Sequence, residues 1–181
     1  MALLISGVLL WSLAHLFKRL APNAREAMGA AGKGAIAIAI LASLVLMTLG
    51  YQNAAGAFFW GRSPMMVGIN NLLVLLAVYL MAAAVGKTWI TGRVRHPQLT
   101  AIKAWAVGHI LENGDVPSLV LFGALLGWAV ISVILINRQD GKPPLQVQTS
   151  AGKEVVTAVG AILAFGGIAF VHIHLGYPVF G

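Results

Sequence analysis

The sequence predicts an all-α fold: a polytopic transmembrane bundle of about six spans, forming one domain over residues 1–181. Hydrophobic residues make up 59% of the chain and charged residues only 9%, whereas soluble domains carry roughly 25% charged residues. Mean hydropathy is +0.88, and the apolar residues are gathered in long stretches separated by short basic gaps. We therefore expect an integral membrane protein surrounded by lipids.

Six apolar stretches are candidate membrane spans. They are Ala2–Phe17, Gly34–Gly50, Met65–Val85, Leu99–Leu111, Ser118–Ile136 and Val155–His174. A helix needs about 17–25 residues to cross a bilayer. Four stretches meet this length, the first is slightly short, and the fourth is clearly short and contains Lys103. The fourth stretch therefore either crosses or re-enters the membrane.

The distribution of basic residues favours six crossings. Eleven of the twelve fall in alternate gaps: Lys18, Arg19, Arg25 and Lys33; Lys87, Arg93, Arg95 and Lys103; Arg138, Lys142 and Lys153. Only Arg62 stands elsewhere, and the gap at 112–117 is acidic. Because Lys and Arg mark the cytoplasmic side, both termini are predicted to lie outside. The chain contains no long basic run and no nucleic-acid-binding module, so nucleic acid is excluded as a partner.

Two segments share a W-x-x-x-H pattern, Trp11 to His15 and Trp105 to His109. Ionisable residues inside a membrane are costly and mark candidate functional sites, and each His is a candidate partner for the other. The chain has no Cys, which excludes thiolate ligation and Fe–S clusters. Two His on two helices can ligate one haem iron from opposite faces. Chance recurrence of the pattern is the alternative.

The predicted topology makes these two helices antiparallel. At 1.5 Å per residue, His15 and His109 lie about 4–5 Å and 9 Å from the basic boundary marked by Lys18 and Lys103. These similar depths predict haem b with bis-His ligation, with the two Trp side chains packed on the macrocycle edges. Four basic residues near this boundary are candidate partners for the propionates: Lys18, Arg19, Arg95 and Lys103. Interface anchoring and topology are the alternative roles of these Trp and basic residues.

Two weaker hypotheses concern polar residues outside the two W-x-x-x-H segments. Glu112, Asn113, Asp115, His172 and His174 gather at the predicted outer side. On a helix His172 and His174 would diverge by about 200°, which favours interfacial polar residues over a metal site. The R-H-P segment at Arg95–Pro97 resembles a helix start of the isoprenylcysteine carboxyl methyltransferase superfamily, but the downstream W-x-x-R and paired glutamates are absent. The roles of His96, His172 and His174 stay open.

Glycines in two places predict close helix packing, because small residues let membrane helices approach each other. Gly29, Gly32 and Gly34 precede the second span, and Gly160, Gly166 and Gly167 lie in the last.

The chain as a whole resembles the NnrU family. The resemblance rests on four segments: His15 within W-x-x-x-H, R-H-P-Q-L at Arg95–Leu99, H-I-L-E-N-G-D within Trp105–Asp115, and L-F-G at Leu121–Gly123. It implies a protein of the bacterial inner membrane associated with denitrification, notably with nitrite and nitric-oxide reductase function. The implied partners, besides lipids, are respiratory or denitrification membrane proteins, and the predicted outer side becomes the periplasm.

The NnrU family is also similar to zeta-carotene isomerase, a membrane haem b enzyme with His ligands. This similarity implies the same pair, His15 and His109. The isomerase carries a Cys three residues before the second His, where this chain has Ala106, so thiolate switching is not implied. The leading hypothesis is a haem b protein in redox or nitrogen-oxide physiology. The alternatives are a haem-dependent polyene isomerase or membrane methyltransferase, and a cofactor-free membrane assembly factor.

Overall fold

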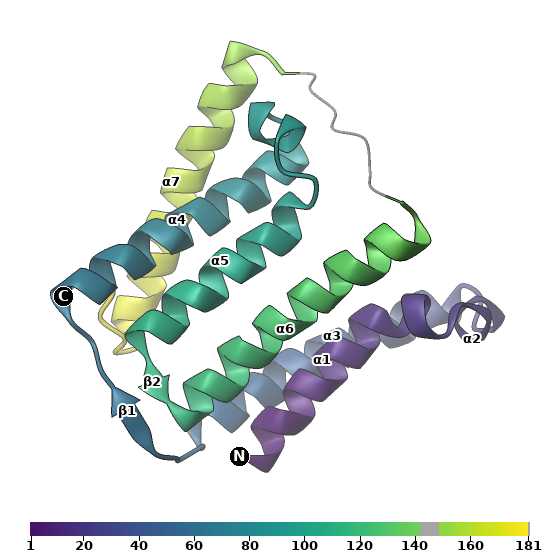
Figure 1. Cartoon of the computed structure of the whole chain (residues 1–181), viewed down its shortest axis with the longest axis horizontal. Coiled ribbons are helices and arrows are strands. Elements are labelled where there is room, and N and C mark those ends of the chain that lie inside the picture. The colour runs from purple at the N-terminus through teal and green to yellow at the C-terminus, as the bar shows by residue number, and fades with distance from the viewer. Residues whose placement is uncertain (142–148, 181) are drawn as a thin grey trace.

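The structure, a computed structural model, describes residues 1–141 and 149–180, and over these ranges it is a bundle of helices (Figure 1). The α-helices are α1 (Ala2–Leu20), α2 (Pro22–Ala27), α3 (Ala31–Gln52), α4 (Pro64–Gly86), α5 (Pro97–Glu112), α6 (Val116–Gln139) and α7 (Ala151–His174). The short elements are the 3-10 helix η1 (Trp89–Gly92) and the antiparallel strands β1 (Phe58–Trp60) and β2 (Gly114–Asp115). The predicted all-α class is confirmed.

Each of the six predicted spans lies within a single α-helix. Five of these helices, α1, α3, α4, α6 and α7, are long and apolar enough to cross a membrane. The first span is longer than expected, because α1 continues through Lys18 and Arg19 to Leu20 and so reaches 19 residues. The fourth, α5, remains the short one at 16 residues.

Local chemistry explains where several helices begin. Ser63 caps α4 by accepting a hydrogen bond from the Met66 amide, and Pro64 occupies the first turn, where its missing N–H costs nothing. Asp115 caps α6 by accepting from the Ser118 amide at 2.8 Å. Pro97 opens α5, as its position in the R-H-P segment predicts. These caps place the turns between helices at fixed points of the sequence.

The helices pack in the spatial order α7, α4, α5, α6, α1, α3 (Figure 1). The short helix α5 lies between α4 and α6, and α6 in turn contacts α1. Small side chains make the α4–α5 contact close, since buried Ala77 and Leu80 of α4 pack against Ala101 of α5. The helix least able to span a membrane by itself is thus flanked by two long apolar helices.

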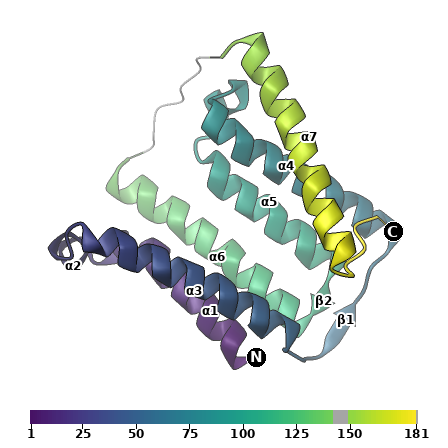
Figure 2. The same ribbon diagram turned by 180° about the vertical axis from the view of Figure 1, so that it is seen from behind.

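Both termini lie at the end of the bundle that holds β1 and β2 (Figures 1 and 2). The opposite end holds α2, η1, the linker before α5 and the start of α7 (Figures 1 and 2). Arg62, between β1 and α4, lies at the strand end, while the other basic residues within the described ranges lie at or within two turns of the opposite end; Lys142 falls outside those ranges. The alternation of charge along the sequence therefore corresponds to two ends of the molecule, as expected for antiparallel crossings. Which end faces the periplasm stays a prediction.

The glycine prediction is wrong for most of the residues it named. A methyl group added at Gly34, Gly160, Gly166 or Gly167 would meet no atom of the described residues within 4 Å. Close approach occurs instead between α1 and α3, where a methyl group at Gly7 would lie 2.7 Å from the Met47 backbone nitrogen. The reason is geometric: a cluster of small residues does not indicate which side of a helix meets another helix.

Candidate functional site

His15 lies near the end of α1 and is half-buried among aromatic rings. Its Nδ1 is 2.9 Å from the Trp11 carbonyl oxygen, one turn earlier. Its ring centroid lies 4.1 Å from that of Trp11 and 5.0 Å from that of Trp128 on α6. A carbonyl oxygen only accepts hydrogen bonds, so we assign the imidazole proton to Nδ1. This tautomer leaves the lone pair of Nε2 uncommitted, which is the state a metal-ligating His requires.

His109 on α5 has a closely similar environment. Its Nδ1 is 2.9 Å from the Trp105 carbonyl oxygen, and its ring centroid is 5.0 Å from that of Trp105 and 4.6 Å from that of Phe122 on α6. We likewise assign the imidazole proton of His109 to Nδ1, which leaves the lone pair of its Nε2 uncommitted. The repeated sequence pattern is thus a repeated local structure: a Trp, a His bonded to its carbonyl, and an aromatic ring of α6.

Helix α6 contacts both Trp–His pairs, and each imidazole packs against a different aromatic ring of this helix. Among the described residues, the ring neighbours of His15 are Trp11 and Trp128, and those of His109 are Trp105 and Phe122. Phe122 and Trp128 are six residues apart, or about 9 Å along the axis of α6. Trp11 and Trp105 both pack against the same core cluster, formed by Leu4, Val8, Met47 and Leu125.

Two buried indole groups beside His15 have no hydrogen-bond partner within the described ranges: Nε1 of Trp11 and Nε1 of Trp128. Trp128 is only 8% exposed. Buried hydrogen-bond donors are almost always satisfied by protein, water or a bound group. These two N–H groups could therefore each donate a hydrogen bond to an acceptor atom of a bound group. Sequence reasoning missed Phe122 and Trp128. The available signal for Trp128 was its position in the middle of an apolar span rather than at a membrane interface.

Two of the four basic residues predicted to partner the propionates, Lys18 and Arg95, lie at the basic end. Lys18 is exposed in the last turn of α1, one turn beyond His15, and Arg95 is exposed in the linker before α5. His96, whose role was open, links the start of α5 to α6, with its Nε2 2.9 Å from Oδ1 of Asn137. His96 therefore has a structural partner on the neighbouring helix.

His172 and His174 both belong to α7, as the angular argument assumed. Each ring bonds through Nδ1 to the carbonyl one turn earlier, His172 to Ile168 at 2.8 Å and His174 to Phe170 at 2.9 Å. Within the ranges that the structure describes, no three His, Asp or Glu side chains are grouped to hold a metal ion.

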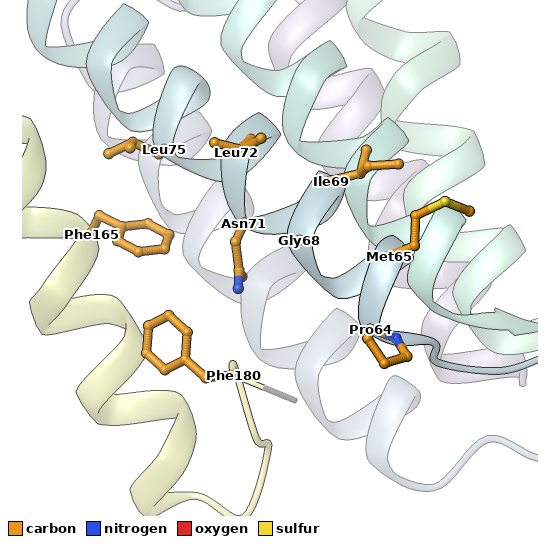
Figure 3. Close-up of a pocket in the computed structure, with 9 residues that line it drawn as sticks. All are labelled: Pro64, Met65, Gly68, Ile69, Asn71, Leu72, Leu75, Phe165 and Phe180. Atoms are coloured by element: carbon orange, nitrogen blue, oxygen red, sulfur yellow. The ribbon is translucent and has the colours of Figure 1, made fainter.

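A groove of about 550 Å³ lies between α4 and α7, away from the two Trp–His pairs (Figure 3). Its walls are apolar side chains of α4, with Phe165 of α7 and Phe180 of the C-terminal segment opposite them. Asn71 supplies its polar edge, and its side-chain amide donates to the Val179 carbonyl at 2.9 Å. The groove contains no ionisable side chain among its lining residues.

These features define a polytopic helical membrane protein with two aromatic-enclosed imidazoles carried by helices that flank a common third helix. The chain belongs to the NnrU family, whose profile, described as NnrU protein, matches residues 3–179. The match covers nearly the whole chain and includes both Trp–His segments. No curated protein and no solved structure matches the sequence.

Proposed function

We propose that this NnrU-family protein is a haem b protein of the bacterial inner membrane in which His15 and His109 would hold the haem iron. The observation that carries the proposal is the shared environment of the two rings. Both have Nδ1 held at 2.9 Å from a Trp carbonyl, and both leave Nε2 uncommitted. Fixing one ring nitrogen through a hydrogen bond sets the tautomer and orientation of a ligating His.

The surrounding residues fit a haem in their chemistry. Imidazole is a common axial ligand, and the chain offers no thiolate as a competitor. Aromatic side chains line the region from α1, α5 and α6. The unpartnered N–H groups of Trp11 and Trp128 would be satisfied by acceptor atoms of a bound group. When bound, a haem supplies one-electron redox chemistry and affinity for diatomic gases, tuned by its ligands and by the polarity around it.

We further propose a role in redox or nitrogen-oxide physiology that supports nitrite and nitric-oxide reduction. The support is the family membership together with the apolar and aromatic side chains that pack around Trp11, Trp105 and Trp128. A haem-dependent isomerase would need a substrate channel, and the groove of Figure 3 lies elsewhere. The cofactor-free assembly factor is the remaining alternative.

The experiment is to purify the protein from a haem-replete bacterial host and measure haem content by the pyridine haemochrome method. Four proteins are compared: wild type, His15→Ala, His109→Ala and His174→Ala. The last is a matched control, because His174 makes the same Nδ1–carbonyl bond but is exposed on α7. We expect haem b in wild type and His174→Ala, and strongly reduced content in the other two.

Three results would overturn the proposal. A wild-type protein without haem removes the cofactor and leaves the assembly factor. Full haem content and an unchanged spectrum in both His15→Ala and His109→Ala assign the haem to other ligands. Loss in one variant alone rejects the shared pair. In a denitrifying host that lacks its own NnrU protein, nitric-oxide consumption restored equally by wild type and both variants would separate the physiological role from the haem.

A further inference from the structure

Glu112, the last residue of α5, is a buried carboxylate with both oxygens engaged. It is 6% exposed. Oε1 lies 3.0 Å from Nε of Arg62, and Oε2 accepts a hydrogen bond from the side-chain amide of Asn70 on α4 at 2.5 Å. Burying a charge is costly unless the charge is paired and hydrogen-bonded. The Glu112 carboxylate has an ion pair with Arg62 and a hydrogen bond from Asn70. Arg62 is also the single basic residue at the strand end within the described ranges.

Helix α5 presents different residues to its two neighbours. Ala101 packs against Ala77 and Leu80 of α4, and Glu112 bonds Asn70 of the same helix. On the other side, Ile102 packs against the cluster containing Trp128, and His109 contacts Phe122. Which side of α5 faces α4 therefore decides whether His109 faces α6.

Asn70 touches α5 on both sides of His109 in the sequence. A methyl group added at Gly108 would lie 2.6 Å from Oδ1 of Asn70 and 3.3 Å from Cβ of Leu73. One turn later, the amide of the same Asn70 bonds Glu112. Residues 108 and 112 point in nearly the same direction, because four residues advance a helix by about 400°. The contact fixes α5 at two points along one line.

We infer that Arg62, Asn70 and Glu112 form a clamp that sets the rotation of α5 about its axis and so directs His109 toward α6. The reach of this effect follows from helix geometry. A side chain about 5–6 Å from the helix axis moves by about 2 Å when the helix rotates by 20°, whereas functional groups need placement within about 0.5 Å. These are positioning residues, and their effect on a haem rests on the proposed function.

The absence of Cys allows a direct test of rotation that needs no haem. Trp105→Cys and Phe122→Cys together place thiols on the facing sides of α5 and α6, at two positions whose ring centroids now lie 5.0 Å apart. The rate of cross-linking by a short bis-maleimide is measured in native membranes, alone and combined with Glu112→Leu or Asn70→Ala. Glu26→Leu is the control, because Glu26 is an exposed carboxylate on α2 at the other end.

We expect the cross-linking rate to fall several-fold with Glu112→Leu, to fall less with Asn70→Ala, and to stay unchanged with Glu26→Leu. If Glu112→Leu does not give a monodisperse protein on size exclusion, Asn70→Ala decides. An unchanged rate in a monodisperse clamp variant overturns the inference, because the rotation is then set elsewhere. In haem-containing protein, the same variants should shift the low-spin spectrum while retaining haem. If wild type holds no haem but the rates fall, the clamp stands and only the proposed function fails.

Discussion

Gly7 lies at a close approach of α1 to α3, and replacing it tests how tightly these two helices are packed. A methyl group at this position would lie 2.7 Å from the Met47 backbone nitrogen, 2.8 Å from Met47 Cγ and 3.0 Å from Leu46 Cβ. The Met47 side chain can rotate away, but the backbone nitrogen cannot move without displacing α3. Gly7→Ala must therefore separate the two helices.

The magnitude follows from comparing this site with an open one. Overpacking a well-packed contact costs about 1–3 kcal/mol, and contact with backbone puts Gly7→Ala at the upper part of that range. Ala also gains roughly 0.5–1 kcal/mol over Gly inside a helix, but that gain is shared by the control, Gly34→Ala, which meets no atom of the described residues within 4 Å. We expect Gly7→Ala to be less stable than Gly34→Ala by about 2–3 kcal/mol.

The assay is reversible unfolding in mixed micelles with a rising fraction of dodecyl sulfate, followed by far-UV circular dichroism. The free energy of unfolding is compared for wild type, Gly7→Ala and Gly34→Ala. Equal stability of the two variants would refute the reasoning, since the α1–α3 contact would then accept a methyl group. Because α1 carries Trp11 and His15, a displaced α1 should also alter the environment of that pair.

Three further predictions concern polar contacts and topology. Tyr51→Phe should lower the free energy of unfolding by about 1 kcal/mol, because the Tyr51 hydroxyl and Ser118 Oγ lie 2.7 Å apart; no change in the micelle assay would mean that this bond contributes nothing. The Arg19 guanidinium, bonded to Asp140 at 2.6 Å, holds the pKa of Asp140 below its ordinary value. The pair therefore stabilises the fold above the unfolded pKa of about 3.9 and loses its effect as pH falls through the lower folded pKa. Asp140→Asn should reduce the melting temperature at neutral pH but not in strong acid, and an equal reduction at both would contradict the pairing. Reporter fusions at the N- and C-termini should give the same periplasmic signal, and opposite signals would contradict an even number of crossings.

The number and order of the main helices followed from the sequence because lipid imposes a simple rule. Every spanning helix needs a long apolar run, and basic residues collect on one side. The short α5 could be recognised as a helix from its apolar run between the basic gap before it and the acidic gap at 112–117, whereas Lys103 within it left open whether it crosses or re-enters. Pro97 marked its start for a local steric reason.

Contacts between helices were much less predictable. Spacing identified His15 and His109, but it gave no means of finding Phe122 and Trp128, which depend on how α6 is rotated. Arg62 and Glu112 are 50 residues apart, and their pairing depends on β1, β2 and the start of α4 meeting at one end. The misplaced glycine prediction has the same origin, since helix rotation is set by tertiary packing.

The most direct test of the central proposal is the low-temperature electron paramagnetic resonance spectrum of the oxidised, purified protein. Two imidazole ligands should give a low-spin ferric haem signal, and this signal should be lost in both His15→Ala and His109→Ala while persisting in His174→Ala. A high-spin signal from the wild-type protein, or the absence of any haem signal, would contradict ligation by the two Trp–His pairs.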